Sequence, residues 1–346
     1  MKIVSLFSGC GGLDLGFIKA GFEVIWANEY DRTIWETYEK NHRETVLDRR
    51  SICDIPSDEI PEADGIIGGP PCQSWSEAGA MRGINDHRGK LFFEFIRILK
   101  DKQPKFFLAE NVSGILLARH KEAVENIIQE FEKAGYKVKI KLLNAHDYGV
   151  PQDRKRVFFV GLRRDINTEF IFPEASPKKK YLKKAIGDLP EAISSQNNKA
   201  VANLDVSNHE YMTGGFSTIY MSRNRVRAWD EPSFTIQAGG RHAPLHPKAP
   251  KMKFIEQNKR IFVPGKENLY RRLSLRECAR VQTFPDDFVF YYSSLADGYK
   301  MVGNAVPVQL AYAMARSVMD SLKTAKTENV SRQKKNPISE YSLQPA

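Results

Sequence analysis

The sequence predicts an α/β protein with a doubly wound, mainly parallel sheet and a smaller, irregular β-rich domain. Short β-type runs alternate with longer amphipathic stretches from residue 1 to about residue 175, as in wound α/β folds. From residue 176 to 272 the pattern changes to isolated β-type fragments separated by Gly and Pro. The length of 346 residues is sufficient for two domains of ordinary size.

The expected strands of the first domain are apolar runs bounded by polar or glycine-rich turns. Apolar residues between these runs recur at helical spacing, and Ala123, Ile127 and Phe131, for example, share one face of an expected helix. We expect strands at 2–7, 23–28, 65–68, 106–110, 138–144 and 156–161, and helices at 13–20, 33–41, 89–100, 121–134, 274–281 and 307–322.

Positive charge is concentrated in the second domain. The chain carries 52 Lys and Arg against 42 Asp and Glu, a net charge of +10. Residues 178–272 hold 18 of the basic and 8 of the acidic residues, so this segment accounts for the whole surplus. Such localisation is typical of a polyanion-binding surface, although a merely soluble lysine-rich face gives the same count. Residues 323–346 are polar and aperiodic, and we expect a disordered basic tail there.

Composition excludes several classes of protein. No apolar run approaches the roughly 20 residues that cross a bilayer, so we expect neither a membrane span nor a signal peptide. The cysteines form no Cys-x-x-Cys pair and have no paired histidines nearby, which predicts no disulfide framework, no metal site and a reducing cytoplasm. The four cysteines are Cys10, Cys53, Cys72 and Cys278.

A glycine-rich turn follows the first expected strand. Phe7 leads into Gly9 and Gly11, and Glu29 stands 20 residues after Gly9, at the end of the second strand. In nucleoside-binding α/β crevices, such glycines let a ligand approach the backbone and the acid binds ribose hydroxyls. The last glycine of the dinucleotide fingerprint is missing, which disfavours a nicotinamide oxidoreductase. Asp54, near the end of an expected third strand, is placed to accept a hydrogen bond from an exocyclic amine.

Cys72 lies in a loop that Pro70 and Pro71 stiffen, directly after the expected strand 65–68. Ligands bind at this carboxyl edge of a parallel sheet. A lone cysteine is more often an inert buried residue than a nucleophile, but two glycines and two prolines build a special backbone around this one. We therefore interpret Cys72 as a candidate nucleophile and the other cysteines as structural.

Charged residues flank two other expected strands. Glu110 ends the apolar run 106–109, where burial tends to raise the pKa of a carboxyl group and lets it donate to a ring nitrogen. A helix-capping or solvent-facing glutamate is the alternative. Arg154 and Arg156 alternate at the start of the last strand and suit phosphate or substrate oxygens, whereas an exposed charged edge is the alternative.

Together these residues resemble the DNA (cytosine-5) methyltransferase family, whose motifs occur here in the family's order. The resemblance covers residues 1–322 and implies a Rossmann-like catalytic and S-adenosylmethionine-binding domain at 1–175. It also implies a target-recognition domain at 176–272 and, at 273–322, a hinge and a helix that returns to the catalytic domain. The matching segments are 7–12, 70–73, 110–112, 152–156, 271–284 and 303–307.

The resemblance implies a role for each candidate site residue. Cys72 is expected to add to C6 of a flipped-out cytosine while Glu110 stabilises N3. Arg154 and Arg156 are expected to support the cytosine and Cys72. S-Adenosylmethionine is the expected co-substrate, without a metal, and its expected contacts are Phe7, Gly9, Gly11, Glu29, Asp54, Ile55, Pro71, Leu91 and Asn304.

The expected partner is double-stranded DNA. Segment 221–227 and residues 234–241 resemble enzymes that modify GGCC, whereas His242-Ala243-Pro244 resembles enzymes of other GC-rich sites. The alternatives are the same chemistry on another GC-rich site or on RNA, and a catalytically silent DNA-binding regulator. The resemblance implies a monomer in the bacterial cytoplasm. It also implies that the protein protects nucleoid DNA from a cognate restriction endonuclease, which is expected as a genetic partner and not as a binding partner. Arginines fit guanine O6 and N7, and the candidate readers are Arg223, Arg225, Arg227 and Arg241.

Overall fold

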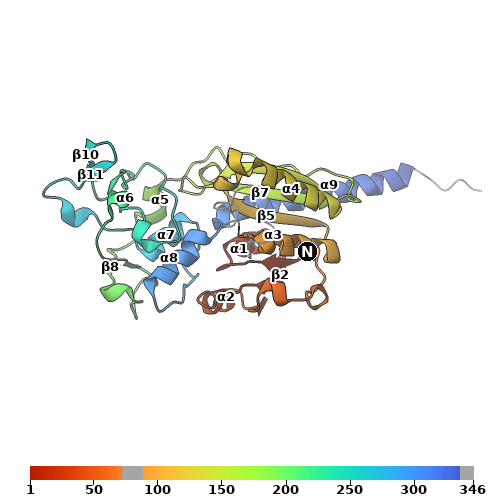
Figure 1. Ribbon diagram of the computed structural model, residues 1–346, viewed down its shortest axis with the longest axis horizontal. Helices are drawn as coiled ribbons and strands as arrows, with labels where there is room; N and C mark the ends of the chain where they lie inside the picture. The colour runs from red at the N-terminus through yellow and green to blue at the C-terminus, as the bar shows by residue number, and fades with distance from the viewer. Residues whose placement is uncertain (72–88, 336–346) are drawn as a thin grey trace, which may run out of the picture.

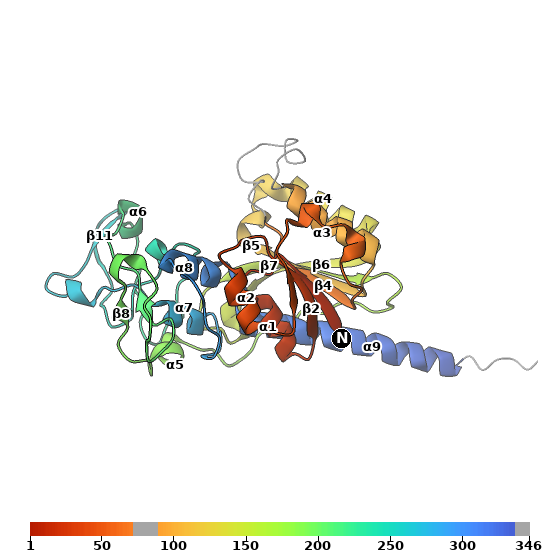
Figure 2. The same cartoon turned by 90° about the horizontal axis from the view of Figure 1, so that it is seen from below.

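The computed structural model describes residues 1–71 and 89–335. One end of the molecule holds a seven-stranded sheet with helices on both faces (Figure 1). The other end, which we name the small lobe and which begins near residue 178, holds short strands, small helices and irregular connections (Figures 1 and 2). The expected class, α/β with a doubly wound and mainly parallel sheet, is confirmed.

The sheet has the order β3-β2-β1-β4-β5-β7-β6. The first five of these strands are parallel, whereas β7 runs antiparallel to both of its neighbours. Parallel strands place their carboxyl ends at one edge of the sheet, where the loops that follow them converge. The strands are β1 (Lys2–Leu6), β2 (Glu23–Asn28), β3 (Val46–Asp48), β4 (Gly65–Gly68), β5 (Phe106–Val112), β6 (Tyr136–Asn144) and β7 (Lys155–Arg163).

Two helix layers cover the sheet. Helices α1 (Gly12–Lys19) and α9 (Val308–Lys335) pack on one face, and α3 (Gly89–Lys102) and α4 (Lys121–Lys133) pack on the other (Figure 2). Helix α2 (Trp35–Asn41) follows β2. Helices α1 and α9 can approach closely because Gly16 has no side chain. A Cβ atom at position 16 would lie only 2.3 Å from the Ala311 Cβ. The last helix is therefore locked against the first.

The hydrophobic core of the small lobe continues into the sheet-containing end of the molecule, because the same cluster includes Cys10 and Ile34. Leu182 and Ile186 of α5 pack with Leu275 and Cys278 of α7 and with Leu295 of α8. Most residues of the expected hinge therefore pack within the small lobe before the chain returns through α9. The elements of this lobe are α5 (Leu182–Ile186), β8 (Ile193–Ser194), β9 (Glu210–Tyr211), α6 (Thr218–Met221), β10 (Lys253–Glu256), β11 (Lys259–Ile261), α7 (Leu275–Val281) and α8 (Leu295–Asn304).

Two local predictions were wrong. Asp54 lies in a short 3₁₀ turn (Ile52–Asp54), because β3 ends at Asp48. The tail beyond Leu322 is not disordered throughout, because α9 continues to Lys335. Once packing has formed the first turns of a helix, each added residue costs little free energy. The helix therefore continues beyond the last residues with apolar periodicity. Residues 336–346 lie outside the described residues.

No helix in the described ranges combines the length and the apolar character that a membrane span requires.

Candidate functional site

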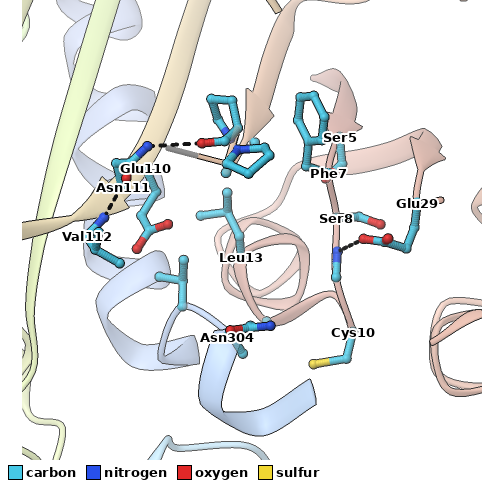
Figure 3. A pocket seen from close by; sticks show the side chains of 18 of the residues that line it. Ser5, Phe7, Ser8, Cys10, Leu13, Glu29, Glu110, Asn111, Val112 and Asn304 are labelled. Atoms are coloured by element: carbon cyan, nitrogen blue, oxygen red, sulfur yellow. Dashed lines mark hydrogen bonds between the residues drawn. The ribbon is translucent and has the colours of Figure 1, made fainter. Parts of the chain in front are cut away.

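A cavity of about 530 Å³ lies at the carboxyl edge of the sheet. Figure 3 shows the loops after β1 and β2 on one side, the end of β5 on the other, and Asn304 of α8 below. The topology brings these segments together because parallel strands present their carboxyl ends at one edge. Sequence-predicted residues that line the cavity are Phe7, Gly9, Glu29, Pro71, Glu110 and Asn304.

Polar groups on the β1–β2 side are preorganised for a polar ligand. The backbone N–H of Gly9 donates to Glu29 Oε2 at 2.9 Å, and that of Asp31 donates to Glu29 Oε1 at 2.8 Å. Burial raises the pKa of Glu29 above its ordinary value, although these donors oppose the shift. The hydroxyl of Ser8 is buried without a hydrogen-bond partner among the described residues. A ligand with hydroxyl and amine groups would satisfy both side chains.

Gly11 shapes the turn and does not line the cavity. Its φ is +84°, and a Cβ atom there would lie 2.0 Å from Nε2 of the buried His42. The His42 ring is held in turn by stacking on Tyr38, with ring centroids 4.5 Å apart. Glycine is therefore required at position 11 by backbone conformation and by packing.

Glu110 occupies the opposite side of the cavity and is 8% exposed. Its Oε1 lies 2.7 Å from Arg156 Nε, but at an angle that leaves this oxygen without a hydrogen bond to the described residues. Burial raises the pKa of Glu110, although the charges of Arg156 and Arg154 oppose the shift. A buried carboxyl group with a raised pKa can hold a proton for a ligand.

Asn111 ties the Glu110 strand to the proline-rich turn. Its Nδ2 donates to the carbonyl of Pro70 at 3.0 Å, and the dashed line in Figure 3 marks this bond. Cys72 lies two residues beyond Pro70 but outside the described residues. Its expected position at the cavity therefore stays a prediction.

Arg154 is fully buried and lies outside the cavity lining. Its guanidinium donates to the carbonyls of Ile236, Gly303 and Ala305 at 2.7 to 2.9 Å. These bonds join the residue before β7 to Ile236 of the small lobe and to the C-terminal end of α8. The structure thus gives Arg154 a positioning role, whereas Arg156 contacts Glu110 directly.

Besides Gly11, three expected cofactor contacts are not brought to the cavity. Asp54 is exposed, Ile55 is buried in the core between the sheet and α3, and Leu91 packs against that same core. None of the three lines the cavity described above.

Sequence reasoning missed several lining residues. Asp14 is fully buried and accepts hydrogen bonds from Ser5 Oγ and Tyr38 Oη, each at 2.6 Å, and burial raises the pKa of Asp14 to about 6. Ser8 also lines the cavity, and its place in the sequence directly before Gly9 could have predicted this. Arg119 and His120 belong to no recognisable sequence motif. They line the cavity because the turns that follow β5 place them there. Further missed lining residues are Asp31, Ile34, Asn111 and Met301.

The four candidate base-reading arginines differ in their surroundings. Arg223 and Arg241 are exposed, and no described residue forms a hydrogen bond or ion pair with either side chain. Arg225 donates from Nε to the Tyr220 carbonyl at 2.9 Å. Arg227 pairs with Asp153 at 3.0 Å, which links the small lobe to the start of β7. The structure thus leaves two of the four guanidiniums free.

Within residues 1–71 and 89–335, no group of three or more His, Cys, Asp and Glu side chains is arranged to hold a metal ion.

Comparison with known proteins gives a consistent family. The family model for C-5 cytosine-specific DNA methylases matches residues 1–320. Type II methyltransferase M.FnuDI of Fusobacterium nucleatum is 63% identical over 328 residues, which cover 93% of this chain and 95% of that protein. Type II methyltransferase M.NgoPII of Neisseria gonorrhoeae is 57% identical over 328 residues, covering 93% and 96%.

Solved structures share the fold. A DNA modification methyltransferase encoded within an E. coli prophage matches with a TM-score of 0.74 at 22% identity, covering 93% of this chain and 99% of that one. A variant of Spodoptera frugiperda DNMT2 matches with a TM-score of 0.67 at 19% identity, with the same coverage of 93% and 99%. The resemblance inferred from the motifs is confirmed.

Arg154→Lys is expected to lower the free energy of unfolding by about 2 to 4 kcal/mol, because a single ammonium nitrogen cannot reach carbonyls that are placed for two separate guanidinium nitrogens. Urea unfolding measures the change, and Arg43→Lys, at an exposed arginine remote from the cavity lining, is the matched control. Equal small changes in both variants would contradict the positioning role.

Proposed function

The chain belongs to the C-5 cytosine-specific DNA methylase family, and we propose that it methylates a cytosine at C5 within a short GC-rich double-stranded site, GGCC by preference. It is a DNA (cytosine-5) methyltransferase of the restriction-modification type. The proposal rests on one observation: Glu29 and Glu110 line the same cavity. Glu29 has the position of a ribose-binding carboxylate, and Glu110 is a buried acid. GGCC rests on the resemblance of residues 221–241 to enzymes of that site.

C5 methyltransferases use S-adenosylmethionine, and the β1–β2 side of the cavity fits it. This co-substrate supplies the methyl group when it is bound. The unpartnered Ser8 hydroxyl and the preorganised Glu29 carboxylate suit its polar groups. We assign the ribose hydroxyls to Glu29 and further contacts to Phe7, Gly9, Pro71 and Asn304, all of which line the cavity.

The β5 side is assigned to the cytosine, which must leave the duplex to reach it. C5 of cytosine is a poor nucleophile. In the proposed reaction the Cys72 thiolate adds to C6 and Glu110 donates its proton to N3. The electron pair released toward C5 then forms the new bond to the methyl carbon, while the bond between that carbon and the sulfonium sulfur breaks and its electron pair stays on the sulfur of the departing S-adenosylhomocysteine. A base then removes the C5 proton, the thiolate is expelled and N3 returns its proton. Arg156 holds Glu110 in place.

We also propose that the protein acts as a monomer in the bacterial cytoplasm and protects host DNA from a cognate restriction endonuclease. RNA is the less favoured substrate. The exposed Arg223 and Arg241 could enter the wide major groove of B-form DNA, whereas the major groove of A-form RNA is too deep and narrow for side chains to read. A silent DNA-binding regulator would not need a buried acid facing a cavity.

Bisulfite sequencing of DNA from cells that express the protein tests substrate, position and site together. The expected result is protection of one cytosine in every copy of a single GC-rich site, and none in cells without the gene. Protection of transfer RNA alone, or of no nucleic acid, would overturn the proposal.

Cys72→Ser is expected to abolish methyl transfer while leaving DNA binding intact, because a hydroxyl is a far weaker nucleophile at neutral pH. A duplex with 5-fluorocytosine at the target should trap a covalent complex with the unmodified protein only when S-adenosylmethionine is present, since the fluorine at C5 cannot leave as a proton after methyl transfer. Denaturing gels, with Cys53→Ser as the exposed-cysteine control, measure the adduct. An adduct that survives Cys72→Ser would exclude this nucleophile.

Glu110→Gln is expected to lower kcat about 100-fold and to leave S-adenosylmethionine affinity nearly unchanged, because an amide cannot transfer the proton. Steady-state kinetics and calorimetry provide the two values, with the exposed Glu122→Gln on α4 as control. A parallel loss of cofactor affinity would instead place Glu110 in the cofactor site.

If Arg241 forms a bidentate contact to guanine, Arg241→Gln should reduce the discrimination between the correct and the wrong base at one base pair by about 1 to 3 kcal/mol. Arg227→Gln should slow methylation of all sequences about equally, because its guanidinium is engaged by Asp153. Methylation rates on duplexes with each target base pair varied in turn measure both. A uniform loss for Arg241→Gln would show that Arg241 grips only the backbone.

A further inference from the structure

The cavity wall continues beyond Glu110 through two short turns. After β5 the chain forms the 3₁₀ turns η4 (Ser113–Leu116) and η5 (Ala118–His120), and then α4 begins. Val112, Gly114, Ile115, Arg119 and His120 all line the cavity. Arg119 is the one Lys or Arg that lines it within the described part of the chain.

His120 orients the Arg119 side chain. Arg119 Nε donates to His120 Nε2 at 3.0 Å, and His120 is only 7% exposed. This bond requires an unprotonated Nε2, so the imidazole acts as a buried acceptor. It fixes the guanidinium near its base while Arg119 itself stays exposed.

The two Nη groups of Arg119 remain available. No described carboxylate pairs with Arg119, whereas the nearby Arg156 pairs with Glu110 and Arg154 is held by three carbonyls. A fixed, exposed guanidinium with free donors suits an oxyanion, and phosphate matches its fork geometry.

We propose that Arg119 binds a DNA phosphate that flanks the target cytosine, and that it thereby holds the extruded nucleotide at the cavity mouth. The inference rests on the proposed function. When a base enters a cavity, its backbone stays outside, and the phosphates are the only anions of the nucleotide. Glu110 and Val112, which precede Arg119 in the wall, lie across the cavity from Glu29 (Figure 3). This placement favours the DNA phosphate over the carboxylate of the co-substrate.

The test pairs a protein change with a change in the DNA. Arg119→Gln should weaken duplex binding about tenfold and lower the salt dependence of binding by about one unit. A methylphosphonate, which removes one phosphate charge, is placed on either side of the target cytosine in turn. One of the two positions should weaken binding by the unmodified protein and have little further effect on Arg119→Gln. Arg43→Gln, which removes an exposed charge away from the cavity lining, is the matched control.

Three results would overturn the inference. Methylphosphonates that weaken the Arg119→Gln variant as much as the unmodified protein would show that Arg119 does not bind those phosphates. Lost S-adenosylmethionine affinity with unchanged DNA binding would assign Arg119 to the co-substrate carboxylate. Equal effects of Arg119→Gln and Arg43→Gln would show only a general charge effect. Methylation by the unmodified protein in the same assay keeps this test separate from that of the proposed function.

Discussion

The arrangement of the two lobes depends on a buried polar network around the start of β7. Arg154 donates to three carbonyls, and Gln152 exchanges hydrogen bonds with the backbone of Ile236 and the side chain of Gln282. Buried polar groups destabilise a fold unless they are paired, so few other arrangements of these segments would provide these partners. The network therefore specifies one docking of the small lobe against the sheet.

The candidate site inherits its geometry from this docking. Arg154 and Arg156 project to the same side of one strand, so a single segment supports both the lobe junction and Glu110. Asn304 reaches the cavity because the carbonyls of its neighbours, Gly303 and Ala305, are bound by Arg154. A disturbance of the junction would thus reach both Glu110 and Asn304, on two sides of the cavity.

Sequence reasoning identified the sheet, the glycine turn and Glu110, because apolar runs and short motifs are local properties. It could not assign Arg154, whose partners are carbonyls 82 to 151 residues away. It misplaced Asp54, since nothing in the local pattern marks the end of β3 at Asp48. Arg119 was missed because the turns after β5, rather than a motif, bring it to the cavity.

The small lobe, the end of α8 and Glu110 all contact the same short segment, 152–156. Asp153 pairs with Arg227 of the small lobe, its neighbour Arg154 binds the segment after α8, and Arg156 contacts Glu110. Because these residues all lie within 153–156, a shift of the small lobe against the sheet would be transmitted along this segment toward Glu110. Under the proposed function, this segment offers a physical route by which the seating of the small lobe on DNA would affect the position of the Glu110 carboxyl group.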